Sequence, residues 1–411
     1  MELFVVAFQL IFDPYVLLVV ILSGAFGLFM GAIPGLSATM ATALLVPVTF
    51  FMPPVPALAS IVTATAMAIF AGDLPGALLR IPGTPASAAY TNEAFAMTRK
   101  GQAELVLGTG LVSAVIGGIF GAVVLSFTAP ILAEFALKFS SFEYFWLASL
   151  GLTCAAFIST ESPAKGLISL MIGLLIATVG IDVTTGHPRF NFGSVELMGG
   201  INFIPAMIGM FAMAEVFRSV TALKPPPRVE QRNIGNIFAG LGKVLYRYKV
   251  NLLRGSTIGV LVGALPGAGS DIAAWISYAV AKKFSKEPEK FGTGHVEGIV
   301  DAGSSNNAGL GGTWVPALVF GIPGDSITAI VIGVLYVKGM NPGPTVFLEQ
   351  PELIYAVFVS FFLANLLLLP LGLVAIKSAK QLLHVPREVL MPVILMFCVV
   401  GTFAINNTVF G

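Results

Sequence analysis

The amino-acid sequence predicts an all-α polytopic membrane protein, and three observations lead to this fold class. Hydrophobic residues make up 56% of the 411 residues and charged residues only 10%, against about 25% in soluble domains. Glycine (45 residues) and proline (26 residues) are abundant, as is usual in membrane helices. The apolar runs are long and lack the two-residue alternation of barrel strands. This composition excludes a soluble enzyme, and the net charge of +1 gives no sign of a nucleic-acid partner.

Apolar runs of two lengths follow one another along the chain. The longer runs are candidate membrane spans, because a span needs roughly 20 apolar residues; they cover 15–30, 105–128, 142–158, 166–181, 201–223, 353–376 and 389–410. Shorter runs, interrupted by glycine and proline, cover 36–52, 55–70, 74–90, 255–265, 270–281, 308–320 and 326–337. Their length predicts broken or re-entrant helices.

A basic segment divides the chain into two halves. Residues 224–254 contain seven Lys or Arg side chains and one acid, Glu230. Cytoplasmic loops are enriched in Lys and Arg, so we place this connector in the cytoplasm. The predicted organisation is a first repeat with additional spanning helices (1–223), the connector (224–254), and a second repeat with its following helices (255–411).

Two Pro-Gly sequences recur in the same order in both halves. Gly31-Ala-Ile-Pro-Gly matches Gly263-Ala-Leu-Pro-Gly, and Arg80-Ile-Pro-Gly matches Gly321-Ile-Pro-Gly. The connectors that follow equivalent Pro-Gly sequences differ in charge. After the first Pro-Gly sequence, the connector of the first half (51–56) is uncharged and that of the second half (282–290) is basic. After the second Pro-Gly sequence, the connector of the first half (98–102) is basic and that of the second half (338–344) leads into acidic residues. Equivalent connectors are then expected on opposite sides of the membrane. Inverted repeats with broken helices are typical of secondary transporters; the alternative is that Pro-Gly only kinks lipid-facing helices.

The four repeated Pro-Gly breaks are the predicted binding site. Proline removes a backbone donor and ends the helix, and the freed groups must line a cavity walled by protein. Hydroxyl residues at the start of each following half-helix can bind an anion or only cap the helix. The substrate-binding candidates are Pro34, Gly35, Ser37, Thr39, Arg80, Pro82, Gly83, Thr84, Pro266, Gly267, Ser270, Asn306, Asn307, Pro323, Gly324 and Ser326. Asn306 and Asn307 belong to a polar stretch that we expect in the cavity wall rather than in a surface loop.

Charged residues within apolar segments are functional candidates, because they are costly there. Asp271 and Asp325, both in the second half, are the candidate cation ligands. Arg80 can bind a substrate carboxylate or pair with Asp73, and Asp73 itself precedes Leu-Pro and can be a helix N-cap. Asp301 is a fifth charged residue of this kind. No catalytic residue, metal site or cofactor is expected apart from the coupling ion, sodium or a proton.

Several stretches resemble the large membrane subunit of the tripartite tricarboxylate transporters. They are 31–36, 263–269, 297 with 305–308, 319–325 with 339–344, and 185–193, so the resemblance runs over nearly the whole chain. Two stretches differ from the pattern. Family members often have Tyr-Gly-Gly-Ser where this chain has Phe70-Ala-Gly-Asp, and Asn-x-Pro-Gly where it has Arg80-Ile-Pro-Gly.

The resemblance implies the permease subunit of a binding-protein-dependent importer of organic di- or tricarboxylates in the bacterial inner membrane. It implies coupling to a cation gradient, usually sodium, and elevator-like movement of the two inverted repeats. The implied partners are a periplasmic solute-binding protein and a small four-helix membrane subunit. It also implies that the natural protein continues beyond Gly411. The alternatives are a stand-alone carboxylate carrier and an intramembrane aspartyl enzyme that uses Asp73 and Asp271.

Overall fold

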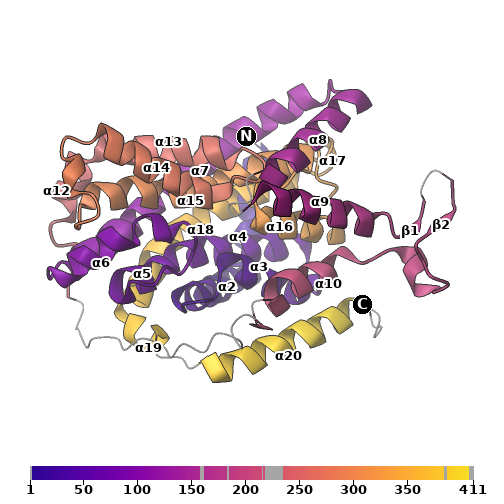
Figure 1. Cartoon of the computed structure of the whole chain (residues 1–411). Coiled ribbons are helices and arrows are strands. Elements are labelled where there is room, and N and C mark those ends of the chain that lie inside the picture. Colours follow the sequence, from indigo (N-terminus) through magenta and orange to yellow (C-terminus); the bar gives the residue numbers. More distant parts are fainter. Residues whose placement is uncertain are drawn as a thin grey trace.

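The computed structural model describes residues 2–157, 162–182, 185–214, 216–217, 235–383 and 387–406. Within these ranges the chain is almost entirely helical, and the only strands are the short antiparallel pair β1 (Gly180–Ile181) and β2 (Pro188–Arg189). Among the described residues, four helices are long and apolar enough to cross a membrane: Pro14–Ala32, Pro54–Leu79, Ala103–Ala136 and Pro351–Lys377. The prediction of an all-α polytopic membrane protein is therefore confirmed (Figure 1).

The first half forms seven α-helices and one short 3-10 turn. They are α1 (Glu2–Ile11), α2 (Pro14–Ala32), α3 (Ala38–Phe50), α4 (Pro54–Ala71), α5 (Asp73–Leu79), η1 (Ser87–Ala89), α6 (Thr91–Arg99) and α7 (Ala103–Ala136). The sequence predicted a helix break between the apolar runs 55–70 and 74–90, and this position is wrong. Helices α4 and α5 are separated only at Gly72 and together make one apolar span, and the chain leaves the helix after Leu79, just before Pro82. The proline at 75 lies in the first turn of α5, where its missing donor is tolerated.

The middle of the chain forms a peripheral arm. It consists of α8 (Ser141–Phe157), α9 (Pro163–Ala177), the β1–β2 hairpin, η2 (Glu196–Gly199), α10 (Phe203–Met207) and the π-helical turn η3 (Ile208–Met213). The hairpin projects from the rest of the molecule in Figure 1. Most of the predicted span 201–223 beyond residue 214, and the connector up to residue 234, lie outside the described residues.

The second half contains the other helices that the structure describes. They are α12 (Leu241–Arg247), α13 (Lys249–Gly263), α14 (Gly269–Phe284), η4 (Pro288–Lys290), α15 (Val296–Phe320), α16 (Ser326–Val337), α17 (Val346–Glu349), α18 (Pro351–Lys377), α19 (Ala379–Leu383) and α20 (Arg387–Asn406). Helix α13 begins at Lys249, inside the predicted connector. The expected separate piece 308–320 is wrong, because α15 continues without a break through the polar stretch 304–307.

The four predicted Pro-Gly breaks are confirmed as helix ends. They lie between α2 and α3, after α5, between α13 and α14, and between α15 and α16. Gly35 and Gly267 have φ angles of +93° and +81°, a backbone region that side chains with a Cβ rarely adopt. Each break therefore contains a proline that cannot donate, and at the breaks after α2 and α13 the following glycine reverses the chain.

Helix α15 is the centre of the bundle. Every residue from Glu297 to Val319 is buried, and α15 packs against α7, α13 and α14. A Cβ atom at Gly117 of α7 would lie 2.1 Å from the Ser304 backbone oxygen, and a Cβ at Gly259 of α13 would lie 2.4 Å from the Ser305 backbone oxygen. The helices can approach this closely only because glycine occupies both positions.

Replacing Gly117 with alanine tests this close contact. Gly117→Ala is expected to lower the free energy of unfolding by about 1–3 kcal/mol, the usual cost of overpacking, because the added methyl group meets backbone that cannot move aside. The matched control is Gly173→Ala in α9, where nothing lies within 4 Å of the added atom. The measurement is the thermal unfolding midpoint of purified protein in detergent. Equal midpoints for the two variants would contradict the close α7–α15 packing.

Candidate functional site

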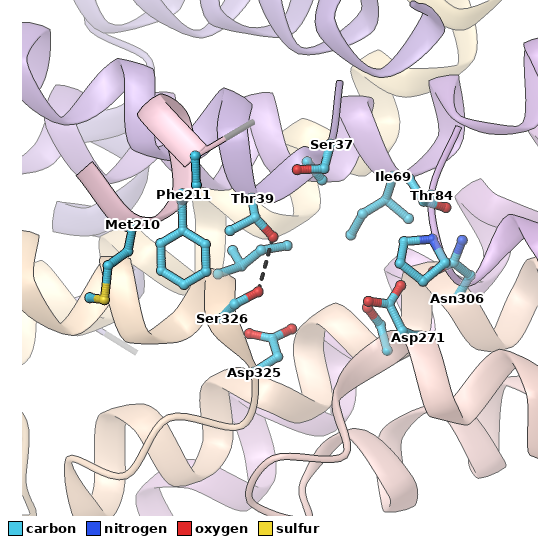
Figure 2. Close-up of a pocket in the computed structure, with 15 residues that line it drawn as sticks. Ser37, Thr39, Ile69, Thr84, Met210, Phe211, Asp271, Asn306, Asp325 and Ser326 are labelled. Carbon is cyan, nitrogen blue, oxygen red and sulfur yellow. Dashed lines mark hydrogen bonds between the residues drawn. The ribbon is translucent and has the colours of Figure 1, made fainter. Parts of the chain in front are cut away.

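A polar cavity of about 370 Å³ lies where the helix breaks of the two halves meet. Figure 2 shows Thr39, Asp325 and Ser326 facing one another, with Met210 and Phe211 at one end and Thr84, Asp271 and Asn306 at the other. Eight of the candidates predicted from the sequence line this cavity: Ser37, Thr39, Thr84, Ser270, Asp271, Asn306, Asp325 and Ser326. These residues are separated by up to almost 300 positions in the chain, so only the tertiary fold brings them together.

Helices from both halves begin at the cavity, and two of them have a capping side chain in its lining. Ser37 is the N-cap of α3, and its Oγ accepts a hydrogen bond of 3.1 Å from the Met40 amide. Asp325 is the N-cap of α16, and it forms a reciprocal capping box with Thr328. Helix N-termini carry partial positive charge and free N–H groups. Both caps also line the cavity, so capping and ligand contact do not exclude each other.

Hydrogen bonds join the two halves across the cavity. The Thr39 and Ser326 hydroxyl oxygens are 3.0 Å apart. On the other side, Asp271 Oδ1 accepts a hydrogen bond of 3.1 Å from the Ala86 amide, and Trp275 Nε1 donates to the Pro85 carbonyl at 3.1 Å. The start of α3 therefore contacts the start of α16, and the segment after α5 contacts the start of α14.

Negative charge is concentrated in this cavity. The carboxylates of Asp271 and Asp325 lie close enough for Asp325 to act electrostatically on Asp271, and no Lys or Arg is among the described residues of the lining. The Asn306 Oδ1 atom is buried and has no hydrogen-bond partner, which leaves it available to a ligand. Two carboxylates with amide and hydroxyl oxygens are suitable ligands for a hard monovalent cation.

The other candidates form or flank the breaks without lining the cavity. Pro34, Gly35, Pro82, Gly83, Pro266, Gly267, Pro323 and Gly324 shape the chain at the helix ends and are absent from the lining. Asn307 is also absent from the lining, and its Nδ2 donates to the Ala66 carbonyl of α4. These residues can position the site but are not placed to contact a molecule inside it.

Arg80 neither lines the cavity nor pairs with Asp73, the two arrangements that the sequence suggested for it. Arg80 ends α5 with a left-handed backbone (φ +60°), is exposed, and donates from Nε to Asn92 Oδ1 at 3.2 Å. It does not line the cavity, and its described contacts do not include Asp73. The N-cap interpretation of Asp73 is wrong, because Gly72 holds that position and Asp73 instead accepts a hydrogen bond from Tyr90.

One wall of the cavity was not predicted from the sequence. It is apolar and includes Ile69 and Ile327, together with Met210, Phe211 and Ala214 from the peripheral arm. The last three belong to or follow the π-helical turn η3, and such turns are frequent at functional sites. Apolar side chains in an apolar run carry no sequence signal that separates a cavity wall from a lipid-facing surface.

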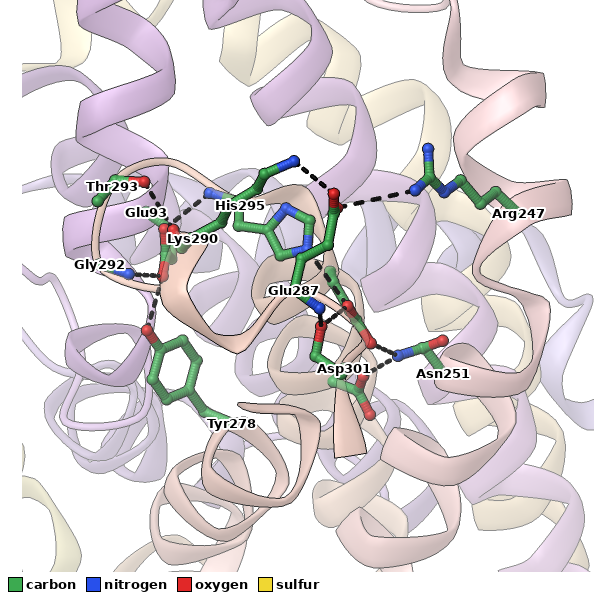
Figure 3. A network of polar contacts seen from close by, with 12 residues as sticks. Glu93, Arg247, Asn251, Tyr278, Glu287, Lys290, Gly292, Thr293, His295 and Asp301 are labelled. Atoms are coloured by element: carbon green, nitrogen blue, oxygen red, sulfur yellow. Dashed lines mark hydrogen bonds and ion pairs between the residues drawn. The ribbon is translucent and has the colours of Figure 1, made fainter. Parts of the chain in front are cut away.

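A second polar network lies near the α14–α15 connector (Figure 3). Asp301 pairs with Arg254 at 2.7 Å and also accepts from Asn251, so its charge is explained by a structural ion pair. Glu93 of α6 accepts from the backbone amides of Gly292, Gly294 and His295.

The same connector contains an exposed ion pair. Lys290 binds the Glu287 carboxylate, and its hydrogen bond lowers the pKa of Glu287 below the usual value. This pair closes the short loop around η4 and does not reach the cavity.

Comparisons with known proteins identify the family. The model of the tripartite tricarboxylate transporter TctA family matches residues 17–411. An uncharacterized 52.8 kDa protein in the TAR-I ttuC' 3' region of Agrobacterium vitis is 35% identical over 385 residues, which is 93% of this chain and 76% of that protein.

A second Agrobacterium vitis protein, from the TAR-II ttuC' 3' region, is 38% identical over 152 residues, which is 37% of this chain and 63% of that protein. No solved structure matches the chain. The family is one of membrane transporters and not of enzymes, which removes the aspartyl-enzyme alternative. The chain therefore belongs to the tripartite tricarboxylate transporter TctA family.

Proposed function

We propose that this chain is the permease subunit of a bacterial inner-membrane importer that moves an organic di- or tricarboxylate together with a cation, sodium in the first instance. The observation that carries the proposal is the cavity in which helix N-termini from both halves meet the carboxylates of Asp271 and Asp325. Helix N-termini attract a carboxylate, and carboxylates that line a cavity within the membrane attract a cation. The family contributes the class of substrate.

The substrate is held by neutral donors. Helices α3 and α16, 13 and 12 residues long, begin at the cavity, where the hydroxyls of Thr39 and Ser326 and the Asn306 amide are also present. Because no Lys or Arg is among the described lining residues, binding depends on these dipoles and on the bound cation. The volume of about 370 Å³ lies in the usual range for sites that bind small molecules.

The cation couples to the substrate through the charge of the cavity. Asp271 and Asp325 repel an anionic substrate while the cation is absent. A cation bound at these carboxylates removes that repulsion, so each ligand raises the affinity for the other. The doubly occupied cavity then carries a smaller net charge, which favours a state that can move across the membrane.

Glycine contacts support the proposal that the halves are repeats. In the first half, a Cβ at Gly83 would lie 3.0 Å from the Gly31 backbone oxygen; in the second half, a Cβ at Gly324 would lie 3.1 Å from the Gly263 oxygen. These are the equivalent positions of the two Pro-Gly pairs. Likewise α2 packs along α4 as α13 packs along α15.

Connector contacts support the inverted orientation of the repeats. Lys100, after the second Pro-Gly of the first half, donates to the Thr293 carbonyl, which lies after the first Pro-Gly of the second half. Lys338, after the second Pro-Gly of the second half, donates to the Phe50 carbonyl, after the first Pro-Gly of the first half. Non-equivalent connectors thus lie together, as inversion requires. The bonds across the cavity favour an elevator-like movement in which the tips of the breaks travel together.

The tripartite family name supports two further partners, a periplasmic solute-binding protein and a small four-helix membrane subunit. The test is uptake of labelled di- and tricarboxylates into vesicles, with and without a sodium gradient, the binding protein and the small subunit. Uptake that requires all of them is the expected result. Uptake that needs neither partner would replace the proposal with a stand-alone carrier, and failure of every carboxylate with all components present would overturn it.

Single substitutions in the cavity are expected to weaken transport without preventing membrane insertion. Ser37→Ala, Ser270→Ala and Asn306→Ala should each raise the half-saturation concentration about twofold to tenfold, because one hydrogen bond contributes about 0.5–1.5 kcal/mol. The control is Ser126→Ala in α7, whose Oγ bonds only within its own helix, to the Ala122 carbonyl. Arg80→Gln should also leave half-saturation unchanged, and a large effect there would contradict the boundaries of the site.

Asp271→Asn tests the cation. The substitution keeps the size of the side chain and removes its charge, so the sodium concentration needed for half-maximal uptake should rise about tenfold or more, as expected when a charged partner is lost. Asp13→Asn is the matched control, because Asp13 is an exposed N-cap of α2 and asparagine also caps well. An unchanged sodium dependence in Asp271→Asn would contradict the assignment of this carboxylate.

A further inference from the structure

One buried carboxylate within the bundle, that of Asp73, is not accounted for by the cavity. Asp73 lies in the Pro54–Leu79 span, whose most apolar window is 94% buried, and Asp73 itself is 9% exposed. Beside it is a space of about 10 Å³, the size of about one water molecule. The wall of this space includes Phe70, Leu107 and Ile299, and Asp73 and Tyr90 are the only titratable residues in it.

The contacts of Asp73 are unlike those of the other buried acids. Its Oδ1 accepts a hydrogen bond of 2.5 Å from the hydroxyl of Tyr90, which is 2% exposed. Among the described ion pairs, none involves Asp73. Asp301 is balanced by Arg254, and Glu93 is held by three backbone amides and the Tyr278 hydroxyl. Asp73 has one neutral donor.

Charged groups on the surrounding helices do not supply the missing cation. Helix α5 packs against α2, α4, α6, α7 and η1. The charged residues on these elements are Glu93 and Arg99 of α6 and Glu104 and Glu134 of α7, and none of them lines the space beside Asp73. An ionised carboxylate in an apolar site without a cation is unfavourable by several kcal/mol. A protonated Asp73 avoids that cost and keeps its hydrogen bond with Tyr90.

Tyr90 connects this carboxyl group to the cavity. Its hydroxyl interacts with the Asn306 side chain and with the charge of Asp271, and both of those residues line the cavity. Asp73 is hydrogen-bonded to Tyr90, and Tyr90 lies near enough to Asn306 to be influenced by it, so polar side chains lead from Asp73 toward the cavity through an otherwise apolar region. The state of the cavity can act on the proton of Asp73 through two side chains.

We propose that Asp73 and Tyr90 form a proton-binding site that takes up and releases one proton in each transport cycle. The proposal rests on the transport function above and adds a proton to the coupling cation. The proton binds to the Asp73 carboxylate when the site is open to the more acidic side and leaves from the same oxygen on the other side. Tyr90 stabilises the ionised form by donating its hydrogen bond.

The experiment uses the complete transporter in vesicles with equal sodium on both sides and an imposed pH gradient. In the wild-type protein, the pH gradient should drive net uptake of substrate. In Asp73→Asn this response should be abolished, while exchange of substrate at equal pH on both sides should continue. Asp13→Asn is the control of matched chemistry and should behave as the wild type. Tyr90→Phe should keep the response but move its midpoint to higher pH, because the ionised carboxylate loses its only donor. A wild type that ignores the pH gradient, or an Asp73→Asn variant that still responds to it, would overturn the proposal.

A second measurement does not require transport. Infrared spectra of the purified protein over a pH series should contain a carboxylic acid band that titrates in the wild type and in Asp13→Asn and is absent from Asp73→Asn. If the same band remained in Asp73→Asn, the proton site would be excluded. If no carboxylate were transported at all, the proposed function would fail, and the band would still decide whether Asp73 binds a proton.

Discussion

The structure depends on close backbone contact between α15 and the helices around it. Gly117 and Gly259 allow α7 and α13 to reach the backbone of α15, and the result is a helix buried over 297–319. Because α15 has no exposed face there, the polar side chains at 304–307 must be satisfied by neighbouring helices or by the cavity. Asn306 lines the cavity, and its buried Oδ1 atom has no hydrogen-bond partner among the described residues, so a ligand in the cavity can satisfy it.

The helix breaks produce the site because they leave helix N-termini inside the bundle. The backbone of a Pro-Gly turn packs directly against a neighbouring helix, and a residue without a Cβ atom allows this approach, as Gly83 does against Gly72. The chain then starts a new helix, and the N-cap side chains of α3 and α16, Ser37 and Asp325, line the cavity. The same local chemistry, a proline, a glycine and a capping side chain, therefore ends one helix, begins another and creates an anion-binding surface.

The four aspartates that lie in or beside the apolar segments fall into three environments, and the environment separates their roles. Asp301 has Arg254 and is structural. Asp271 and Asp325 share a polar cavity without a described basic residue, which favours a bound cation. Asp73 has a tyrosine hydroxyl and an apolar surround, which favours a proton. Sequence position alone assigns all four acids to one group of costly charges inside apolar segments, and only their contacts distinguish them.

The sequence by itself determined the fold class, the helix breaks and most polar residues of the cavity, because composition, Pro-Gly pairs and hydroxyl residues act locally on the backbone. Ser37 and Ser326 were found in this way. The tertiary structure alone decided that Arg80 lies outside the cavity, that 304–307 lies within a continuous helix, and that Met210 and Phe211 form a wall. These outcomes depend on how the helices cross. An apolar or charged side chain has the same local preferences whether it faces a cavity, a neighbouring helix or the membrane.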